Sequence, residues 1–399
     1  MPQEQVASQD RSSIRFIGEK SGMEARSRVL IVWHGALYPS YRKPFWILQT
    51  QYGWEVHLLT VPKWSQALPR RTRFESAVDE PITLHIRRAF CKMHGALFFQ
   101  PAFFRIFNRV RPDVVYVIEE PYSLMGWLAT YWCKRRVPNL PVILYTYQDI
   151  QKTYPLPFRA MERYVFRHAD RILVSHSKGG WVLERKGYAK MWDKLPAAVN
   201  LDRFTYKEPR YAGGLFTLGY VGRLSEEKGL DTLLWALTEL SEDVRLRIAG
   251  DGPARFRLEK LARELGVYEQ VAFLNAVSHE ALPEFYHECD ALVLPSKTRS
   301  HWQEQFGRVL VEAMACGTPV IGSDSGAIPE VIGGAGLTFP EGKPKLLADK
   351  IWTLMQDTRL QKDLSFRGRV RVEREYSAER VAKKLNQHLR EVTGHACGD

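Results

Sequence analysis

The 399-residue chain lacks several features that would place it in a specialised class. Its five cysteines lie far apart and form no Cys-x-x-Cys pair, so neither a zinc site nor a disulfide framework is indicated. The longest stretches without a charged residue, such as residues 29–41, fall short of the roughly 20 residues that a membrane-spanning helix needs. Residues 1–28 have no apolar core, so we interpret them as a flexible leader and not as a signal peptide. These absences favour a cytoplasmic protein.

Nothing in the composition is extreme. Hydrophobic residues make up 45% and charged residues 26%, which is ordinary for a globular protein and excludes a disordered or fibrous chain. A chain of this length exceeds what one compact core usually organises, and it suits two domains.

The net charge of +12 is unevenly distributed. Residues 1–210 contain 33 Lys and Arg against 18 Asp and Glu, a balance of +15, whereas residues 211–399 contain 24 against 27, a balance of −3. This asymmetry indicates an anionic partner for the first half: nucleic acid, an acidic membrane surface or a charged substrate.

Short apolar runs alternate with amphipathic stretches along most of the chain, which predicts parallel sheets covered by helices. The fold class expected is α/β, with two doubly wound Rossmann-like domains facing across a cleft. The divisions expected are a first domain over residues 29–205, a second over 206–375, and a C-terminal helix at about 376–395 that packs back on the first. In such sheets, ligands bind where the carboxyl ends of the strands meet.

The first candidate site is a glycine-bounded turn that follows an apolar strand. Gly222 would let a ligand approach the backbone, and the cations Arg223 and Lys228 lie five residues apart near a helix start. This arrangement suits a pyrophosphate, although a turn with solvated charges is equally compatible with this segment alone. No GxxxxGK[ST] sequence is present, which disfavours a P-loop ATPase.

The second candidate site contains two carboxylates eight residues apart. Glu304 precedes a predicted helix that starts near Phe306 and Gly307, and Glu312 lies inside that helix among apolar residues. At about 1.5 Å per helical residue the two are separated by roughly 9–12 Å, about the span from a sugar to a ribose across a pyrophosphate. The free N–H groups of the helix start would face the phosphate.

These segments resemble family-4 retaining glycosyltransferases, which have the two-domain GT-B fold. The resemblance lies in the Glu-x7-Glu spacing of Glu304 and Glu312, in residues 250–253 (GDGP), in residues 315–321 (ACGTPVI) and in residues 326–330 (GAIPE). It covers nearly all of residues 215–340 and is looser in the first half.

The resemblance implies that Arg223 and Lys228 bind the leaving diphosphate of a nucleotide sugar. It also implies that Glu304 contacts the transferred hexose, aided by backbone donors at Phe306 and Gly307, and that Glu312 binds the ribose. Such enzymes retain the anomeric configuration and need no metal or other cofactor, and the chain has no Asp-x-Asp pair. The donor implied is a UDP- or GDP-hexose, and the acceptor a glycan or a lipid-linked precursor.

The first half departs from that family in two places. Where many relatives have a Gly-Gly loop after the first strand, this chain has residues 34–43, and we expect Arg42 at the cleft rim as an anion contact or, equally, as part of a basic helix start. Where many relatives have Thr-x-His, this chain has Thr146 and Gln148, and because Gln148 cannot titrate it cannot act as a general base.

Other features of the first half also suggest acceptor contacts. Glu120 ends a strand and would orient an acceptor hydroxyl or else cap the next helix. Basic residues interleaved with aromatics would give a peripheral contact with an anionic membrane, although solubilising charge explains them as well. The candidates for that contact are Arg42, Lys43, Arg87, Arg88, Lys92, Arg105 and Arg109.

The function expected is transfer of a hexose to a glycan or glycolipid-precursor hydroxyl, in the cytoplasm or on the inner face of the membrane. The alternatives are a relative that uses a soluble phosphosugar acceptor, one that epimerises a nucleotide sugar, and a basic nucleic-acid-binding protein. The last lacks a recognisable nucleic-acid motif and leaves Glu304 and Glu312 unexplained, so no nucleic-acid partner is expected.

Overall fold

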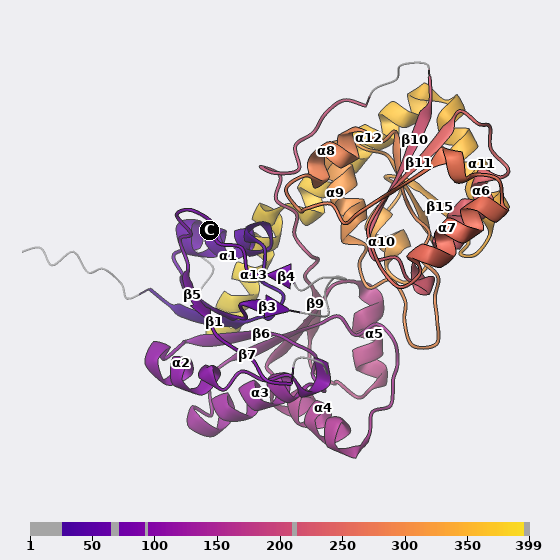
Figure 1. Cartoon of the computed structure of the whole chain (residues 1–399). Coiled ribbons are helices and arrows are strands. Elements are labelled where there is room, and N and C mark those ends of the chain that lie inside the picture. The colour runs from indigo at the N-terminus through magenta and orange to yellow at the C-terminus, as the bar shows by residue number, and fades with distance from the viewer. Residues whose placement is uncertain (1–25, 65–71, 92–94, 210–213, 395–399) are drawn as a thin grey trace, which may run out of the picture.

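The structure is a computed structural model, and it describes residues 26–64, 72–91, 95–209 and 214–394. Most of the expected leader, and Lys92 among the basic candidates, lie outside these residues. As the alternating pattern predicted, the chain forms two parallel sheets with helices on both faces (Figure 1).

The first sheet has seven strands in the order β5-β2-β1-β6-β7-β8-β9, all paired in parallel. In that order they are Thr83–Ile86, Glu55–Thr60, Arg28–Val32, Val114–Ile118, Val142–Thr146, Arg171–Val174 and Trp192–Lys194. The central strands β6 and β7 are apolar and completely buried, as expected for strands covered on both faces. A short antiparallel ribbon, β3 (Lys63–Trp64) with β4 (Thr72–Arg73), and the last strand, β9, were not predicted.

Helices cover both faces of this sheet. One face carries α1 (Pro39–Tyr52) and α13 (Ala378–Thr393), whose Phe45, Leu48, Val381 and Leu385 pack on it. The other face carries the remaining helices of this half: α2 (Ala102–Val110), α3 (Leu124–Arg136), α4 (Leu156–His168) and α5 (Ser177–Arg185), with the short 3₁₀ turn η1 (Gly95–Leu97).

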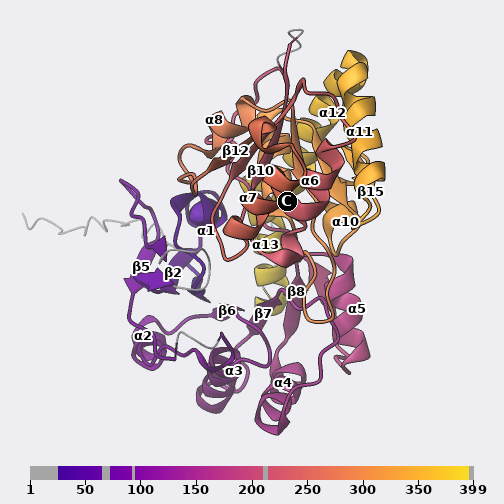
Figure 2. The same ribbon diagram turned by 45° about the vertical axis from the view of Figure 1, so that its right-hand side comes forward.

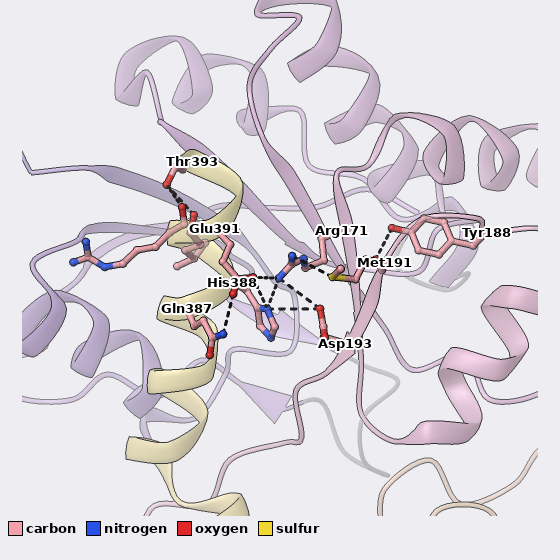
Figure 3. A network of polar contacts seen from close by, with 10 residues as sticks. Arg171, Tyr188, Met191, Asp193, Gln387, His388, Glu391 and Thr393 are labelled. Carbon is pink, nitrogen blue, oxygen red and sulfur yellow. Dashed lines mark hydrogen bonds and ion pairs between the residues drawn. The ribbon is translucent and has the colours of Figure 1, made fainter. Parts of the chain in front are cut away.

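The last helix, α13, lies against the first sheet although it begins 184 residues after the end of β9. Arg171 of β8 donates a hydrogen bond from NH1 to His388 Nδ1 at 2.7 Å and forms ion pairs with Glu391 and Asp193 (Figure 3). Trp54 Nε1 also donates to Asn386 Oδ1 at 2.8 Å. These contacts tie the end of the described chain to its beginning.

The second sheet has six parallel strands in the order β12-β11-β10-β13-β14-β15. In that order they are Val271–Leu274, Val244–Ala249, Phe216–Val221, Ala291–Leu294, Val320–Ser323 and Leu337–Phe339, the last of which was not predicted. Its helices are α6 (Leu230–Leu237), α7 (Arg255–Glu264), α8 (Leu282–His287), α9 (Arg308–Cys316), α10 (Ile328–Ile332), α11 (Pro344–Gln356) and α12 (Thr358–Arg371). Short turns complete it at η2 (Glu226–Lys228), η3 (Tyr268–Gln270) and the π-helical η4 (Val372–Tyr376). One continuous apolar core joins this sheet to its helices.

The two halves meet at the carboxyl ends of their strands. The loop after β13 (residues 295–307) reaches the first half, where Gln303 Nε2 donates to the Asp149 carbonyl at 2.7 Å and Lys178 Nζ donates to Gln303 Oε1 at 2.6 Å. Figure 1 shows this loop, in orange, descending beside α5. We call residues 295–307 the donor loop below.

Candidate active site

The floor of the candidate donor site is made of glycines at the carboxyl ends of β10 and β11. Gly222 has a φ of 151° and donates its N–H to the Ala249 carbonyl at 3.1 Å. A Cβ on Gly250 would lie 1.9 Å from the Gly222 carbonyl oxygen, so the two turns can approach only because Gly250 lacks a side chain. Gly222 itself is half-buried, and its contact with a ligand stays a prediction.

Lys228 and Glu304 lie together above this floor. Lys228 Nζ is 2.7 Å from Glu304 Oε2, and Ser296 Oγ donates to the same oxygen at 2.9 Å. They meet because β10 and β13 are neighbours in the sheet, so the segments that follow them share one edge. The structure thus joins two residues 76 positions apart that the sequence analysis assigned to one ligand.

Lys228 contacts an aromatic ring as well as the Glu304 carboxylate. Its ammonium lies 4.7 Å from the centre of the Trp302 ring, and Glu304 is only 8% exposed. Gly229, at φ 67°, ends the short turn η2 and allows close contact with the Pro295 carbonyl. Arg223 is exposed in the segment between β10 and η2, directly after Gly222.

The start of α9 also faces this region. Gly307 has a φ of 77° and is the N-cap residue, and Phe306 is buried against the Tyr376 ring with centroids 5.8 Å apart. The backbone of these two residues therefore lies at the positive end of a nine-residue helix, next to Glu304.

Glu312 lies deeper, one turn inside α9. Tyr286 donates its hydroxyl to Glu312 Oε2 at 2.8 Å, and His279 Nε2 lies 3.9 Å from Oε1. Burial raises the pKa of Glu312 to about 7, opposed by Arg308 and Tyr286. The carboxylate is 3% exposed, so its assigned contact with a ribose stays a prediction.

Arg42 does not line the cleft, and its prediction as an anion contact was wrong. α1 begins at Pro39, so Arg42 lies inside the helix, where it is completely buried. Its guanidinium pairs with Glu80, donates to the carbonyls of Ala36 and Glu75, and stacks 4.4 Å from the centre of the Phe74 ring. A cation with its donors so occupied holds the α1 region together.

Glu120 lies at the carboxyl edge of the first sheet, as expected, but it does not cap a helix. Ser123 caps α3, since its Oγ accepts from the Gly126 N–H. Glu120 accepts from Thr146 Oγ1 at 2.5 Å and from the Tyr147 N–H at 3.0 Å. Burial raises its pKa to about 7.

Gln148 is held by a network that the sequence analysis missed. Its Nε2 donates to the Tyr154 hydroxyl at 3.0 Å and to Glu162 Oε1 at 3.2 Å, and its Oε1 accepts from Lys186 Nζ at 3.1 Å. Lys186 also pairs with Glu162 at 2.5 Å. No local pattern could have revealed this network, because its members come from the loop after β7, from α4 and from the C-cap of α5.

Asp149 and His176 are a second pair that the sequence analysis did not identify. His176 Nε2 lies 3.9 Å from Asp149 Oδ2, and the two side chains are 2% and 4% exposed. Among the residues that the structure describes, neither that oxygen nor either ring nitrogen of His176 has a hydrogen-bond partner. Burial raises the pKa of Asp149 to about 6 and lowers that of His176 to about 4. Gln303 joins this buried pair to the donor loop.

The described residues contain no group of three or more His, Cys, Asp or Glu arranged to hold a metal ion. Among the same residues, no helix is both long and apolar enough to cross a membrane.

Comparison with known proteins identifies the fold and the second half. Residues 205–371 match the family "Glycosyl transferases group 1". Sucrose-phosphate synthase from Thermosynechococcus elongatus superposes with a TM-score of 0.69 at 21% identity, over 93% of this chain and all of that one. The fold is GT-B. Residues 205–371 form its glycosyl transferases group 1 domain.

Curated relatives match about half of this chain. A D-inositol 3-phosphate glycosyltransferase from a Mycobacterium species is 36% identical over 44% of this chain and 42% of its own length. A GDP-mannose-dependent alpha-(1-6)-phosphatidylinositol monomannoside mannosyltransferase from Mycobacterium tuberculosis is 32% identical over 51% of this chain and 57% of its own. The chain thus spans about half the length of these relatives. The candidate donor residues, from Gly222 to Glu312, all lie within the matched residues 205–371.

Proposed function

We propose that this protein is a retaining glycosyltransferase of family 4 that moves a hexose from a nucleotide sugar to a hydroxyl of a glycan or glycolipid precursor. The observation that carries the proposal is the contact of Lys228 with Glu304 above the glycine floor of the glycosyl transferases group 1 domain. The contact supports the proposal because it brings a cation and a carboxylate side by side where parallel strands end.

In this proposal the donor lies across the edge of the second sheet. Arg223 and Lys228 bind the diphosphate, with the N–H groups of Phe306 and Gly307 at the start of α9. Glu304 accepts hydrogen bonds from the hexose and Glu312 from the ribose. The nucleotide is UDP or GDP, and the mannosyltransferase relative is named for its dependence on GDP-mannose.

The chemistry is a substitution on one face of the sugar. The bond from the anomeric carbon to the phosphate oxygen breaks as a bond to the acceptor oxygen forms, and the departing phosphate takes the acceptor's proton. Lys228 and Arg223 stabilise the charge that develops on that phosphate, a role that needs no metal or other cofactor. Because the departing phosphate takes the proton, this route requires no general base at the position of Gln148, whose side chain does not titrate.

The first half contributes the acceptor side, with Glu120 and Gln148 near the reacting hydroxyl. A soluble phosphosugar acceptor and epimerisation of a nucleotide sugar remain the alternatives within the GT-B fold. We place the enzyme in the cytoplasm, in peripheral contact with the inner face of the membrane when its acceptor is lipid-linked.

A thermal-shift panel of UDP-, GDP- and ADP-sugars tests the proposal, since a ligand that binds the native state raises the melting temperature. We expect one nucleotide series to stabilise the wild type and to lose that effect in Lys228→Ala. The matched control is Lys345→Ala, which removes a lysine of the same half at the start of α11. No response to any nucleotide sugar would refute the donor assignment.

A further inference from the structure

A basic hollow lies on the outer side of the first half, between the start of α4 and the end of α5. Its volume is about 250 Å³. The charged side chains that line it are Lys152, Arg159, Arg163, Arg185, Lys186 and Glu162. Five cations thus surround one carboxylate in a concave site.

The positive charge of the hollow is not neutralised by the protein. Glu162 pairs with Lys186, and Lys152 donates to the His301 carbonyl at 2.7 Å, which carries no net charge. Within residues 26–64, 72–91, 95–209 and 214–394, no carboxylate forms an ion pair with the guanidinium of Arg159, Arg163 or Arg185. Arg159 and Arg163 are four residues apart on α4, where like charges repel. An anion in the hollow would relieve that repulsion.

The position of the hollow connects it to the candidate reaction centre. Its inner wall is Tyr154, Glu162 and Lys186, the three groups that hold Gln148. Lys152, on its rim, reaches the donor loop three residues before Glu304. A ligand anchored in the hollow would therefore contact the groups that hold Gln148, beside the donor loop.

We propose that this hollow binds a phosphoryl group of the acceptor, so that the acceptor is a phosphorylated molecule whose hydroxyl is presented to the donor sugar. The inference rests on the proposed transfer function and names its acceptor class. Arginine forks match the oxygens of a phosphate in pairs, and an excess of four positive charges suits a phosphomonoester or diphosphate better than one carboxylate.

The proposal also locates the basic character of the first half. The residues chosen from sequence lie on α1, α2 and the β5 region, and Arg42 among them is buried. The uncompensated cations lie instead on α4 and α5, two helices that cover the same face of the first sheet (Figure 2).

Calorimetry of the full chain with inorganic pyrophosphate tests this. The measurement is made in the Arg223→Ala/Lys228→Ala background, which silences the proposed donor phosphate site. We expect Arg159→Gln/Arg163→Gln to weaken the remaining binding at least tenfold, and Arg159→Lys/Arg163→Lys to restore most of it. The control Arg135→Gln/Arg136→Gln removes two exposed cations from the neighbouring helix α3 and should change affinity less than twofold. Circular dichroism verifies that each variant is folded.

The outcomes separate the two proposals. If Arg159→Gln/Arg163→Gln binds pyrophosphate as its parent does, or if the α3 control loses as much, the hollow is not a phosphoryl site and this inference is overturned. If pyrophosphate binding is the same in the wild type and in Arg223→Ala/Lys228→Ala but is lost in the α4 variant, the hollow stands and the donor assignment fails.

Two probes identify the source of the phosphoryl group. Competition by glycerol 3-phosphate that depends on Arg159 and Arg163 supports a soluble phosphorylated acceptor. Binding to phosphatidylcholine vesicles containing phosphatidic acid, with the same dependence and no glycerol 3-phosphate competition, supports a lipid acceptor. Absence of that dependence with both probes contradicts the proposal.

Discussion

In the second half of the molecule, the candidate donor residues come from two short segments, 222–229 and 296–312, that leave neighbouring strands of one sheet. In the first half, the residues around Gln148 come from the loop after β7, from α4 and from the C-cap of α5. Both halves place their polar groups at the carboxyl edge of a parallel sheet. The second half does so with glycines and backbone turns, and the first half with long side chains that hold one another.

This contrast explains why the two halves differ as sequences. The turn at Gly250 constrains residue types locally, because any side chain there would clash with the Gly222 carbonyl oxygen. A side-chain network such as that of Gln148, Glu162 and Lys186 constrains only the fit among its members. We infer that the donor side follows a common plan and that the acceptor side is individual to this chain.

The largest effect is expected where the first half is held by a buried ion pair. Arg42→Ala would leave Glu80 buried without its partner and should lower the free energy of unfolding by about 3–5 kcal/mol. Denaturant titration measures this, and nucleoside diphosphate affinity of the folded fraction should stay at the wild-type value. A stable variant with weakened nucleotide binding would return Arg42 to the cleft.

Within the donor half, the two glutamates should separate sugar transfer from nucleotide binding. Glu304→Gln should reduce hexose transfer at least tenfold, about 1.4 kcal/mol, while nucleoside diphosphate affinity changes only a few-fold. Glu312→Ala should instead weaken nucleoside diphosphate binding itself. Calorimetry and initial rates on the same preparations check this, and the reverse pattern would exchange the two roles.

On the acceptor side, the buried Glu120 should make stability depend on pH. Burial raises its pKa from the ordinary 4.5 to about 7, so its contribution to stability is complete below pH 4.5 and is lost as pH rises through 7. Glu120→Gln, which resembles the protonated form, should therefore reduce the fall in melting temperature between pH 5 and pH 8 by a few degrees. An unchanged pH profile would mean that Glu120 is solvated.

The smallest effect concerns the basic surface of α2. We expect reversible binding to anionic but not to zwitterionic vesicles, weakening as salt rises. Arg105→Gln should reduce it roughly fivefold, about 1 kcal/mol, whereas Arg359→Gln on α12 should leave it unchanged. Co-sedimentation with vesicles measures this binding. Equal binding to both lipid types would contradict the membrane contact and would mean that the +15 charge of residues 1–210 serves solubility.

Much of the fold was predictable because buried parallel strands read as apolar runs. All eleven apolar runs that we predicted as strands, such as those of β6 and β13, lie within a residue of the observed strands. The three-residue strands β9 and β15 were too short to show a period. The sequence pattern predicts that the first helix begins at Lys43, whereas α1 begins four residues earlier, at Pro39. That error placed Arg42 at a helix start and led to its wrong prediction.

The site was predictable only where one segment determines the geometry. The turn at Gly222 and the Glu304–Glu312 spacing are local, so their residue types indicate a ligand. The Asp149–His176 pair and the partners of Gln148 depend on contacts across 14 to 154 residues, which no periodicity reports. Arg42 shows the same limit, since Glu80 lies 38 residues away.

Titration of the purified protein with the nucleoside diphosphate identified by the thermal-shift panel tests the division of labour most directly. The account predicts at least tenfold weaker binding in Arg223→Ala/Lys228→Ala and a change of less than twofold in Gln148→Ala, because the donor diphosphate contacts only the second half. Wild-type affinity in the first variant, or a comparable loss in Gln148→Ala, would contradict it.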